Sequence, residues 1–154
     1  MPTRFIRFDP VDIGSAWFSG RYYPGSGQGG VLLKASCQWD RFRLGVAYLE
    51  MWGDIADGPA GPVPVEMQLP VYAGFDIWHN PKKTWLFYGA VPDIYAEVGI
   101  SLRDPKVMKA ALACDVDYYG FGLMVEGGGY LNPGNGNTFY AGVLLRFLTF
   151  GIGF

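Results

Sequence analysis

The sequence predicts an all-β protein, an antiparallel up-and-down barrel of about eight strands with its interior filled by side chains. Turn-forming clusters of glycine, proline and asparagine recur along the 154 residues, and the segments between them alternate apolar and polar residues. Side chains along a strand point to opposite faces, so such alternation is typical of strands with one apolar face. No linker divides the chain, and we expect a single domain over residues 1–154.

Eight strands are expected after an N-terminal extension at residues 1–10. They lie at approximately 12–23, 29–39, 41–52, 64–78, 83–102, 106–116, 120–131 and 138–154. The first strand runs up to the turn PGSGQGG, and its alternation is ambiguous. The second and third carry apolar residues at almost every second position, from Val31 to Trp39 and from Phe42 to Trp52.

The fourth strand has the clearest alternation, from Val65 to Ile77. Pro70 lies within it and cannot donate to a ladder, so it calls for a bulge or an unpaired rim. In the fifth strand, Pro92 and Asp93 interrupt the alternating segment. If they form a turn, the strand count becomes nine.

The sixth strand has a rival interpretation. Asp104 followed by Pro105 is typical of the start of a helix, so a short helix over 104–114 is the alternative to a strand. The seventh strand runs into the turn NPGNGN, and the eighth alternates up to the last residue, Phe154.

Two features favour a barrel whose apolar face meets lipid. The polar face includes small residues such as Gly45, Ala47, Gly99 and Ala111, which are unusual on a water-exposed sheet but make room inside a narrow barrel. The expected connections also alternate between short and long, as in membrane barrels with an even strand count. We therefore expect a transmembrane barrel. A soluble all-β barrel or sandwich that binds a small apolar ligand in its core is the alternative.

The last strand resembles the closing strand of bacterial outer-membrane β-barrels, because Leu148, Phe150, Ile152 and Phe154 alternate in register. In that family the assembly machinery recognises such an ending, so the resemblance implies an assembly signal at Phe150, Ile152 and Phe154. It also implies an outer-membrane location. The implied partners are the lipid bilayer and outer-leaflet lipids, and a larger membrane assembly is compatible with the resemblance. Arg146 lies an even number of residues from Phe154, so it should point to the same, lipid-facing side of the strand. It should lie near the membrane interface opposite the C-terminus, where its long side chain can snorkel.

The polar face predicts a network of ion pairs that fills the barrel interior. Its expected members are Lys34, Arg41, Arg43, Glu66, Asp76, Glu97, Lys109, Asp115, Asp117 and Glu126. Aromatic residues near strand ends predict belts at the membrane interfaces. The expected interface residues are Trp39, Phe42, Trp52, Trp78, Trp85 and Tyr118, together with Arg146.

No catalytic, cofactor or metal site is predicted. His79 is the only histidine and falls in the turn HNPKK, and no serine lies in a nucleophile motif. We expect a structural or accessory role without catalysis, and a lipid-modifying outer-membrane enzyme is the second alternative. The net charge of -2, without a basic block, argues against nucleic acid as a partner. Cys37 and Cys114 are expected to be free thiols on the outward faces of separate strands.

The apolar runs are only a few residues long, far short of the roughly 20 that a spanning helix needs. The segment MPTRFIRFDP contains arginine but no apolar stretch, so we expect no secretory signal in the chain as given. Either export is not involved, or the signal has been removed.

Overall fold

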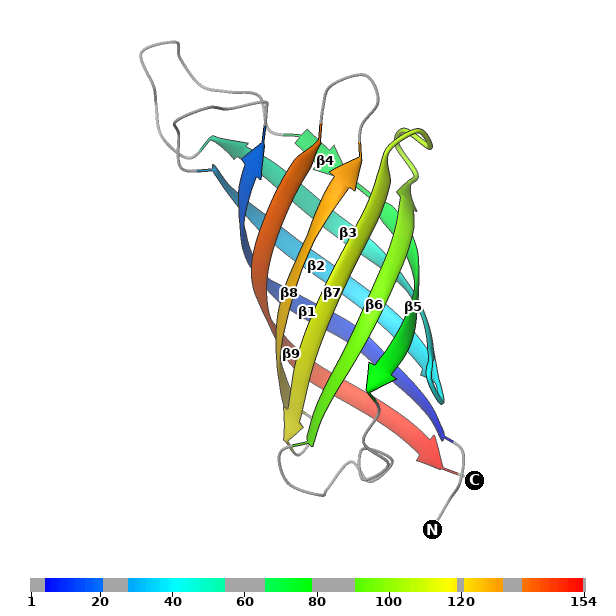
Figure 1. Cartoon of the computed structure of the whole chain (residues 1–154). Coiled ribbons are helices and arrows are strands. Elements are labelled where there is room, and N and C mark those ends of the chain that lie inside the picture. Colours follow the sequence, from blue (N-terminus) through cyan, green and yellow to red (C-terminus); the bar gives the residue numbers. More distant parts are fainter. Residues whose placement is uncertain are drawn as a thin grey trace.

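The chain forms a closed, antiparallel, all-β barrel in a computed structural model that describes residues 5–20, 28–54, 66–78, 91–118, 121–131 and 137–153 (Figure 1). Its strands are β1 (Phe5–Gly20), β2 (Gln28–Trp39), β3 (Phe42–Asp54), β4 (Glu66–Gln68), β5 (Pro70–Trp78), β6 (Val91–Ser101), β7 (Met108–Tyr118), β8 (Phe121–Leu131) and β9 (Thr138–Gly153). Neighbouring strands pair along the wall, and the β1–β9 pairing closes it. Because β4 and β5 both pair with β3, they share one wall position. The predicted eight-stranded up-and-down barrel is confirmed.

The two ends of the barrel differ in which connections they carry. β1 begins and β9 ends at the same end, which we call the terminal end, and the opposite end is the distal end (Figure 1). Asp40 and Arg41 join β2 to β3 at the terminal end, and residues 102–107 join β6 to β7 at the distal end. No helix among the described residues is long and apolar enough to cross a membrane.

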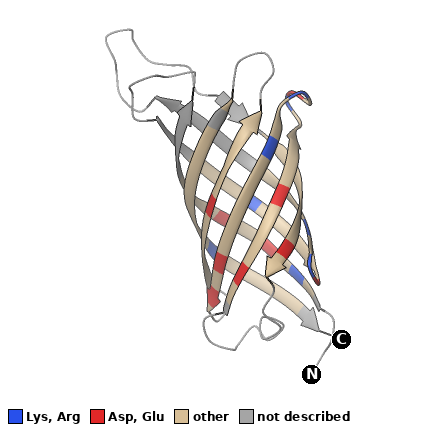
Figure 2. Ribbon diagram, viewed as in Figure 1, with Lys and Arg blue, Asp and Glu red and all other residues tan. Residues whose placement is uncertain are grey.

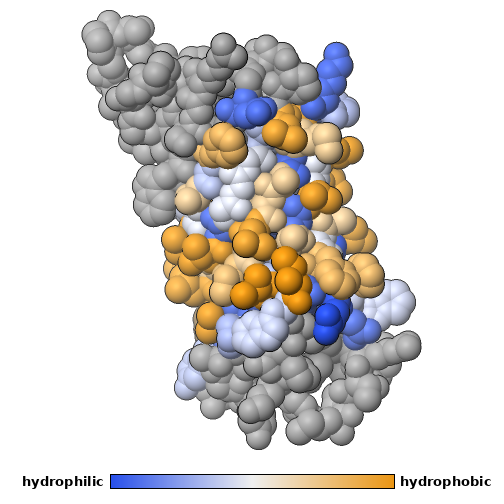
Figure 3. Space-filling model, in the orientation of Figure 1, coloured by the Kyte–Doolittle hydropathy of each residue, from blue (hydrophilic) through white to orange (hydrophobic). Residues whose placement is uncertain are grey.

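Charged side chains of the wall point into the barrel, and most of its large apolar side chains point out of it. In β7 buried and exposed residues alternate along most of the strand, as they do in β5. The buried set includes many charged side chains, and the exposed set includes large apolar residues such as Val98, Leu112, Val125 and Leu145. Figure 2 marks the charged positions along the wall, and Figure 3 shows apolar side chains gathered on its visible outer face. Burial of so many charged side chains is unusual for a water-soluble domain, and the interior also contains apolar side chains such as Leu32, Met124 and Leu144.

The alternative helix over 104–114 is wrong, since Met108 begins a strand that pairs with β6 and β8. Apolar and polar residues alternate in this segment, which suits a strand with two chemically different faces. The pairing of β7 with β6 and β8 outweighs the local helix signal of Asp104 and Pro105. The Asp104 carbonyl instead accepts a hydrogen bond from the Val107 amide at 2.9 Å, within the turn before the strand.

Residues 5–10 belong to the wall, so the expected N-terminal extension is wrong over this part. A register shift between Asp9 and Asp12 accommodates Pro10, so the proline does not end β1. Likewise, Pro92 and Asp93 lie inside β6 and pair with β7, so they form no turn. β6 starts at Val91, and the earlier part of the expected fifth strand lies outside the described residues.

Pro70 marks a break in the wall, as its missing amide proton predicts. β4 ends at Gln68 and β5 begins at Pro70, with Leu69 between them. The Leu69 carbonyl accepts a hydrogen bond from the Leu102 amide at 2.9 Å, so the break stays attached to the neighbouring chain segment. The proline therefore divides one wall position into two strands without opening the barrel.

Arg146 faces the interior, and its expected place at the membrane interface is wrong. Val11 pairs with Leu148 and Asp12 pairs with Arg146, so β9 contains one extra residue at Phe147. Such a bulge lets two successive side chains point outward, and Phe147 and Leu148 are 43% and 51% exposed. Counting in twos from the C-terminus therefore gives the wrong face for every residue before the bulge.

Candidate functional site

The interior is occupied by two clusters of charged side chains. The distal cluster, which we call the distal quartet, consists of Lys34, Glu97, Lys109 and Glu126 from β2, β6, β7 and β8. The Lys34 Nζ atom donates to Glu97 Oε1 at 2.9 Å and to Glu126 Oε2 at 2.6 Å. The Lys109 Nζ atom lies 3.3 Å from Glu97 Oε1 and 3.6 Å from Glu126 Oε1. Tyr140 Oη also donates to Glu126 Oε1, at 3.2 Å. Each ammonium thus faces both carboxylates.

Tyrosine rings surround the two lysines of the distal quartet. The Lys34 Nζ atom lies 4.6 Å from the centre of the Tyr72 ring. The Lys109 Nζ atom lies 5.7 Å, 6.0 Å and 5.2 Å from the ring centres of Tyr72, Tyr130 and Tyr140. Cations attract the faces of aromatic rings, most strongly where water is excluded. The rings therefore stabilise the buried ammonium groups and fill the space between them.

The second cluster lies nearer the terminal end and is centred on Arg146. Its Nε and Nη2 atoms bind both carboxylate oxygens of Asp12, at 2.8 Å and 3.0 Å. Its Nη1 atom donates to Asp115 at 2.9 Å and to Asp117 at 3.2 Å, and Nε also lies 3.4 Å from Asp9. This guanidinium, which is 1% exposed, ties β9 to β1 and β7.

Arg43 joins the other side of the barrel to the same cluster. It donates to Asp76 at 2.9 Å, to Asp93 at 3.2 Å and to Asp115 at 3.4 Å. The guanidinium carbon lies 3.9 Å from the centre of the Tyr95 ring. Asp115 therefore bridges two arginines, and the cluster spans the interior from β3 to β9.

A third arginine completes this cluster. The Arg7 Nε atom donates to Asp9 at 2.9 Å, and Nη1 lies 2.5 Å from Asp117. Thr149 adds a hydroxyl hydrogen bond to Asp9 at 3.0 Å. We call the whole group the terminal cluster; it consists of Arg7, Asp9, Asp12, Arg43, Asp76, Asp93, Asp115, Asp117 and Arg146.

Eight of the ten residues predicted for the interior network have side chains in these two clusters. The prediction for Arg41 is wrong, because its side chain is exposed. It occupies a two-residue turn in which Asp40 has a φ of 48°, and a turn residue is not bound by strand alternation. The side chain of Glu66 lies outside the described residues.

The sequence interpretation missed several members of the interior. Arg7, Asp9 and Asp12 fell in or next to the expected extension, and Arg146 was assigned to the wrong face. The inward tyrosines share strand parity with the charged residues, and that parity is the signal that could have identified them. These are Tyr72, Tyr95, Tyr130 and Tyr140.

Aromatic side chains line the outside of the terminal end. Among the predicted interface residues, Trp39, Phe42, Trp78 and Tyr118 are each at least half exposed and lie where a strand begins or ends. The side chains of Trp52, Trp85, Ile152 and Phe154 lie outside the described residues. Phe150 is exposed on the outer wall.

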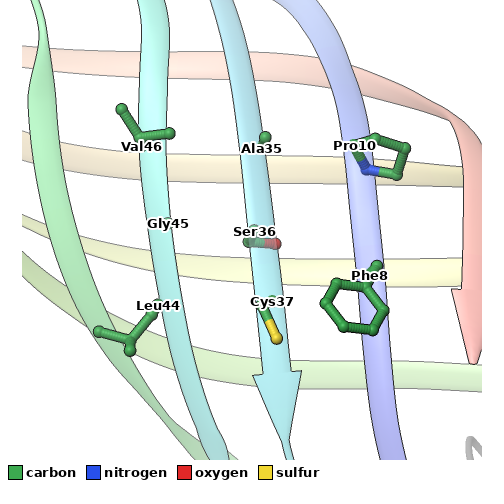
Figure 4. A pocket seen from close by; sticks show the side chains of 8 residues that line it. All are labelled: Phe8, Pro10, Ala35, Ser36, Cys37, Leu44, Gly45 and Val46. Carbon is green, nitrogen blue, oxygen red and sulfur yellow. The ribbon is translucent and has the colours of Figure 1, made fainter.

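A shallow apolar hollow of about 450 Å³ lies on the outer wall, over β1, β2 and β3 (Figure 4). Its lining includes Phe8, Pro10, Ala35, Cys37, Leu44 and Val46. Cys37 and Cys114 are free, as predicted, and lie on β2 and β7.

Comparison with family models, curated proteins and solved structures found no match. Among the described residues, no group of three or more histidine, cysteine or acidic side chains is placed to hold a metal ion. His79 lies outside the described residues. The interior is a network of ion pairs between strands, in which some buried atoms, among them Arg7 Nη2, Asp9 Oδ2 and Glu97 Oε2, have no hydrogen-bond partner among the described residues.

Proposed function

We propose that this chain is a small bacterial outer-membrane β-barrel with a structural or accessory role and no catalytic activity. The observation that carries this proposal is the reversed polarity of the wall, with charged residues inside and large apolar residues outside. Soluble monomers rarely expose contiguous apolar patches above a few hundred Å². Lipid, by contrast, is a suitable solvent for such a surface.

The length of the strands supports the same proposal. β7 and β8 have 11 residues each. At about 3.3 Å per residue and a tilt of roughly 40°, such a strand climbs about 28 Å, close to the roughly 25 Å apolar band of membrane barrels. The aromatic side chains at the terminal end then lie at the level expected for an interfacial belt.

The filled interior supports a structural role rather than transport or binding of an apolar ligand. The distal quartet and the terminal cluster occupy the barrel at two levels, and buried Tyr95 lies between Asp93 and Glu97, which belong to the two clusters, along β6. An apolar ligand in this interior would leave charged groups without partners, which costs several kcal/mol per group. The outer wall and the rims are therefore the surfaces proposed for contacts with lipids or with a larger membrane assembly.

Folding into a bilayer tests the proposal. The purified chain is folded into phospholipid vesicles and run on an SDS gel with and without boiling. We expect the unboiled, folded barrel to migrate differently from the boiled chain, and to remain with the vesicles after a carbonate wash. A monodisperse, folded protein in buffer without detergent or lipid would contradict the proposal and favour the soluble alternative.

A further inference from the structure

A hollow of about 480 Å³ lies beside the turn between β2 and β3, at the terminal end of the barrel. It is lined by Trp39, Asp40, Arg41, Phe42 and Phe75. The Phe42 and Phe75 rings meet edge to face, with centres 5.3 Å apart, and form one apolar side of the hollow. The hollow thus combines an aromatic surface with an exposed arginine among its lining residues.

The turn that carries the guanidinium is anchored to the barrel interior. Buried Gln38 donates to the Asp40 carbonyl at 2.9 Å and to the Asp76 carboxylate at 2.5 Å. The Asp76 amide donates to the Arg41 carbonyl at 2.8 Å. Because Asp76 belongs to the terminal cluster, the backbone of the turn is connected to the ion network inside the barrel.

Arg41 differs from the other arginines of the wall. Arg7, Arg43 and Arg146 are buried and bind aspartates, whereas the Arg41 side chain is exposed and has no ion-pair partner among the described residues. A guanidinium presents a planar fork of donors that matches the oxygens of a carboxylate or phosphate. Arg41 therefore offers an unused anion-binding group next to an apolar hollow.

We propose that this hollow binds a glycerophospholipid, with its phosphodiester on Arg41 and the start of its acyl chains against Trp39, Phe42 and Phe75. This inference rests on the proposed membrane location. Trp39 and Phe42 form the last pair of the β2–β3 ladder, so Arg41 lies just beyond the aromatic level, where headgroup phosphates are found. The largely apolar lining favours a lipid over a free phosphate ion.

The turn also sets the size of the headgroup that the hollow can recognise. Asp40 and Arg41 both line the hollow, and Arg41 is the only basic residue among its lining residues. A single phosphodiester carries one negative charge, which one guanidinium can bind through two oxygens.

Lipid retention by the folded protein tests the inference. The barrel is purified in detergent, incubated with phosphatidylglycerol or with the diacylglycerol of the same acyl chains, and analysed by native mass spectrometry. Wild type should retain phosphatidylglycerol, and Arg41→Gln should retain it about tenfold less tightly, because a charge-assisted, forked contact is lost. Arg41→Lys should lie between them. Arg103→Gln, at an exposed position of the distal turn, is the matched control and should behave as wild type.

Three results would overturn the inference. Equal retention by Arg41→Gln and Arg103→Gln would show that the guanidinium does not bind the lipid. Equal retention of diacylglycerol and phosphatidylglycerol would show that the phosphate is not recognised. Displacement of the lipid by millimolar inorganic phosphate would assign the site to a free anion. Failure of the wild-type barrel to enter vesicles would instead refute the proposed function, so the two failures are distinguishable.

Discussion

Replacing Arg146 by methionine tests the assignment of this residue to the barrel interior. Methionine keeps an unbranched side chain but removes the charge and all hydrogen bonds. Asp12, which is 1% exposed, would lose both hydrogen bonds that its carboxylate oxygens accept from Arg146. Asp115 and Asp117 would each lose a hydrogen bond from the same guanidinium.

The expected loss of stability is large. Removing one partner of a buried ion pair costs about 3–5 kcal/mol, because the remaining charge stays buried without compensation. An arginine facing lipid would give the opposite sign, since its removal stabilises a barrel by about 2–4 kcal/mol at the midplane and by about 0–1 kcal/mol near an interface. The sign of the change therefore distinguishes the interior from the lipid face.

Urea titration of the vesicle-folded protein, followed by tryptophan fluorescence, measures the free energy of unfolding. Arg146→Met should be destabilised by about 3–5 kcal/mol, and Asp12→Asn in the same background should recover about 1–2 kcal/mol of it. Arg103→Met, on the exposed turn, should stay within about 0.5 kcal/mol of wild type. Unchanged or increased stability of Arg146→Met would refute the interior assignment.

Two further substitutions test the packing and the outer wall. A side chain at Gly45 would collide with the ring of Tyr72, so Gly45→Leu should lower the free energy of unfolding by about 1–3 kcal/mol; an equal loss in a Tyr72→Ala background would show that the ring is not the cause. Leu112 points outward in the middle of β7, and Leu112→Arg should destabilise the vesicle-folded barrel by about 2–4 kcal/mol. A change below about 0.5 kcal/mol would be that of a water-exposed surface and would contradict a lipid-facing wall.

Much of the fold is readable from the sequence because strand alternation is a local property. In β7, Lys109 and Asp115 share parity, and both lie inside the barrel, whereas Leu112 and Cys114 have the other parity and lie outside. Short turns limit how antiparallel neighbours pair. The number of wall positions and the face of most residues follow from these two facts.

The candidate site could be predicted only in part. Parity identifies which charged residues point inward, but it does not say which of them meet. Lys34 and Glu126 lie 92 positions apart in the chain, and only the closure of the barrel brings their side chains to 2.6 Å. The same closure brings Arg146 to Asp12, which is 134 positions away.

The all-β class, the eight wall positions and the alternation of the two faces can be predicted from residues that are close together in the chain. The details that depend on pairing between strands follow from the three-dimensional fold. Because of the bulge at Phe147, Arg146 points into the barrel. The register shift near Pro10 allows residues 5–10 to pair within the wall. The turn at Asp40 places the Arg41 side chain outside the barrel. A bulge adds one residue to one strand relative to its partner, so its position is a property of two strands and cannot be counted along one.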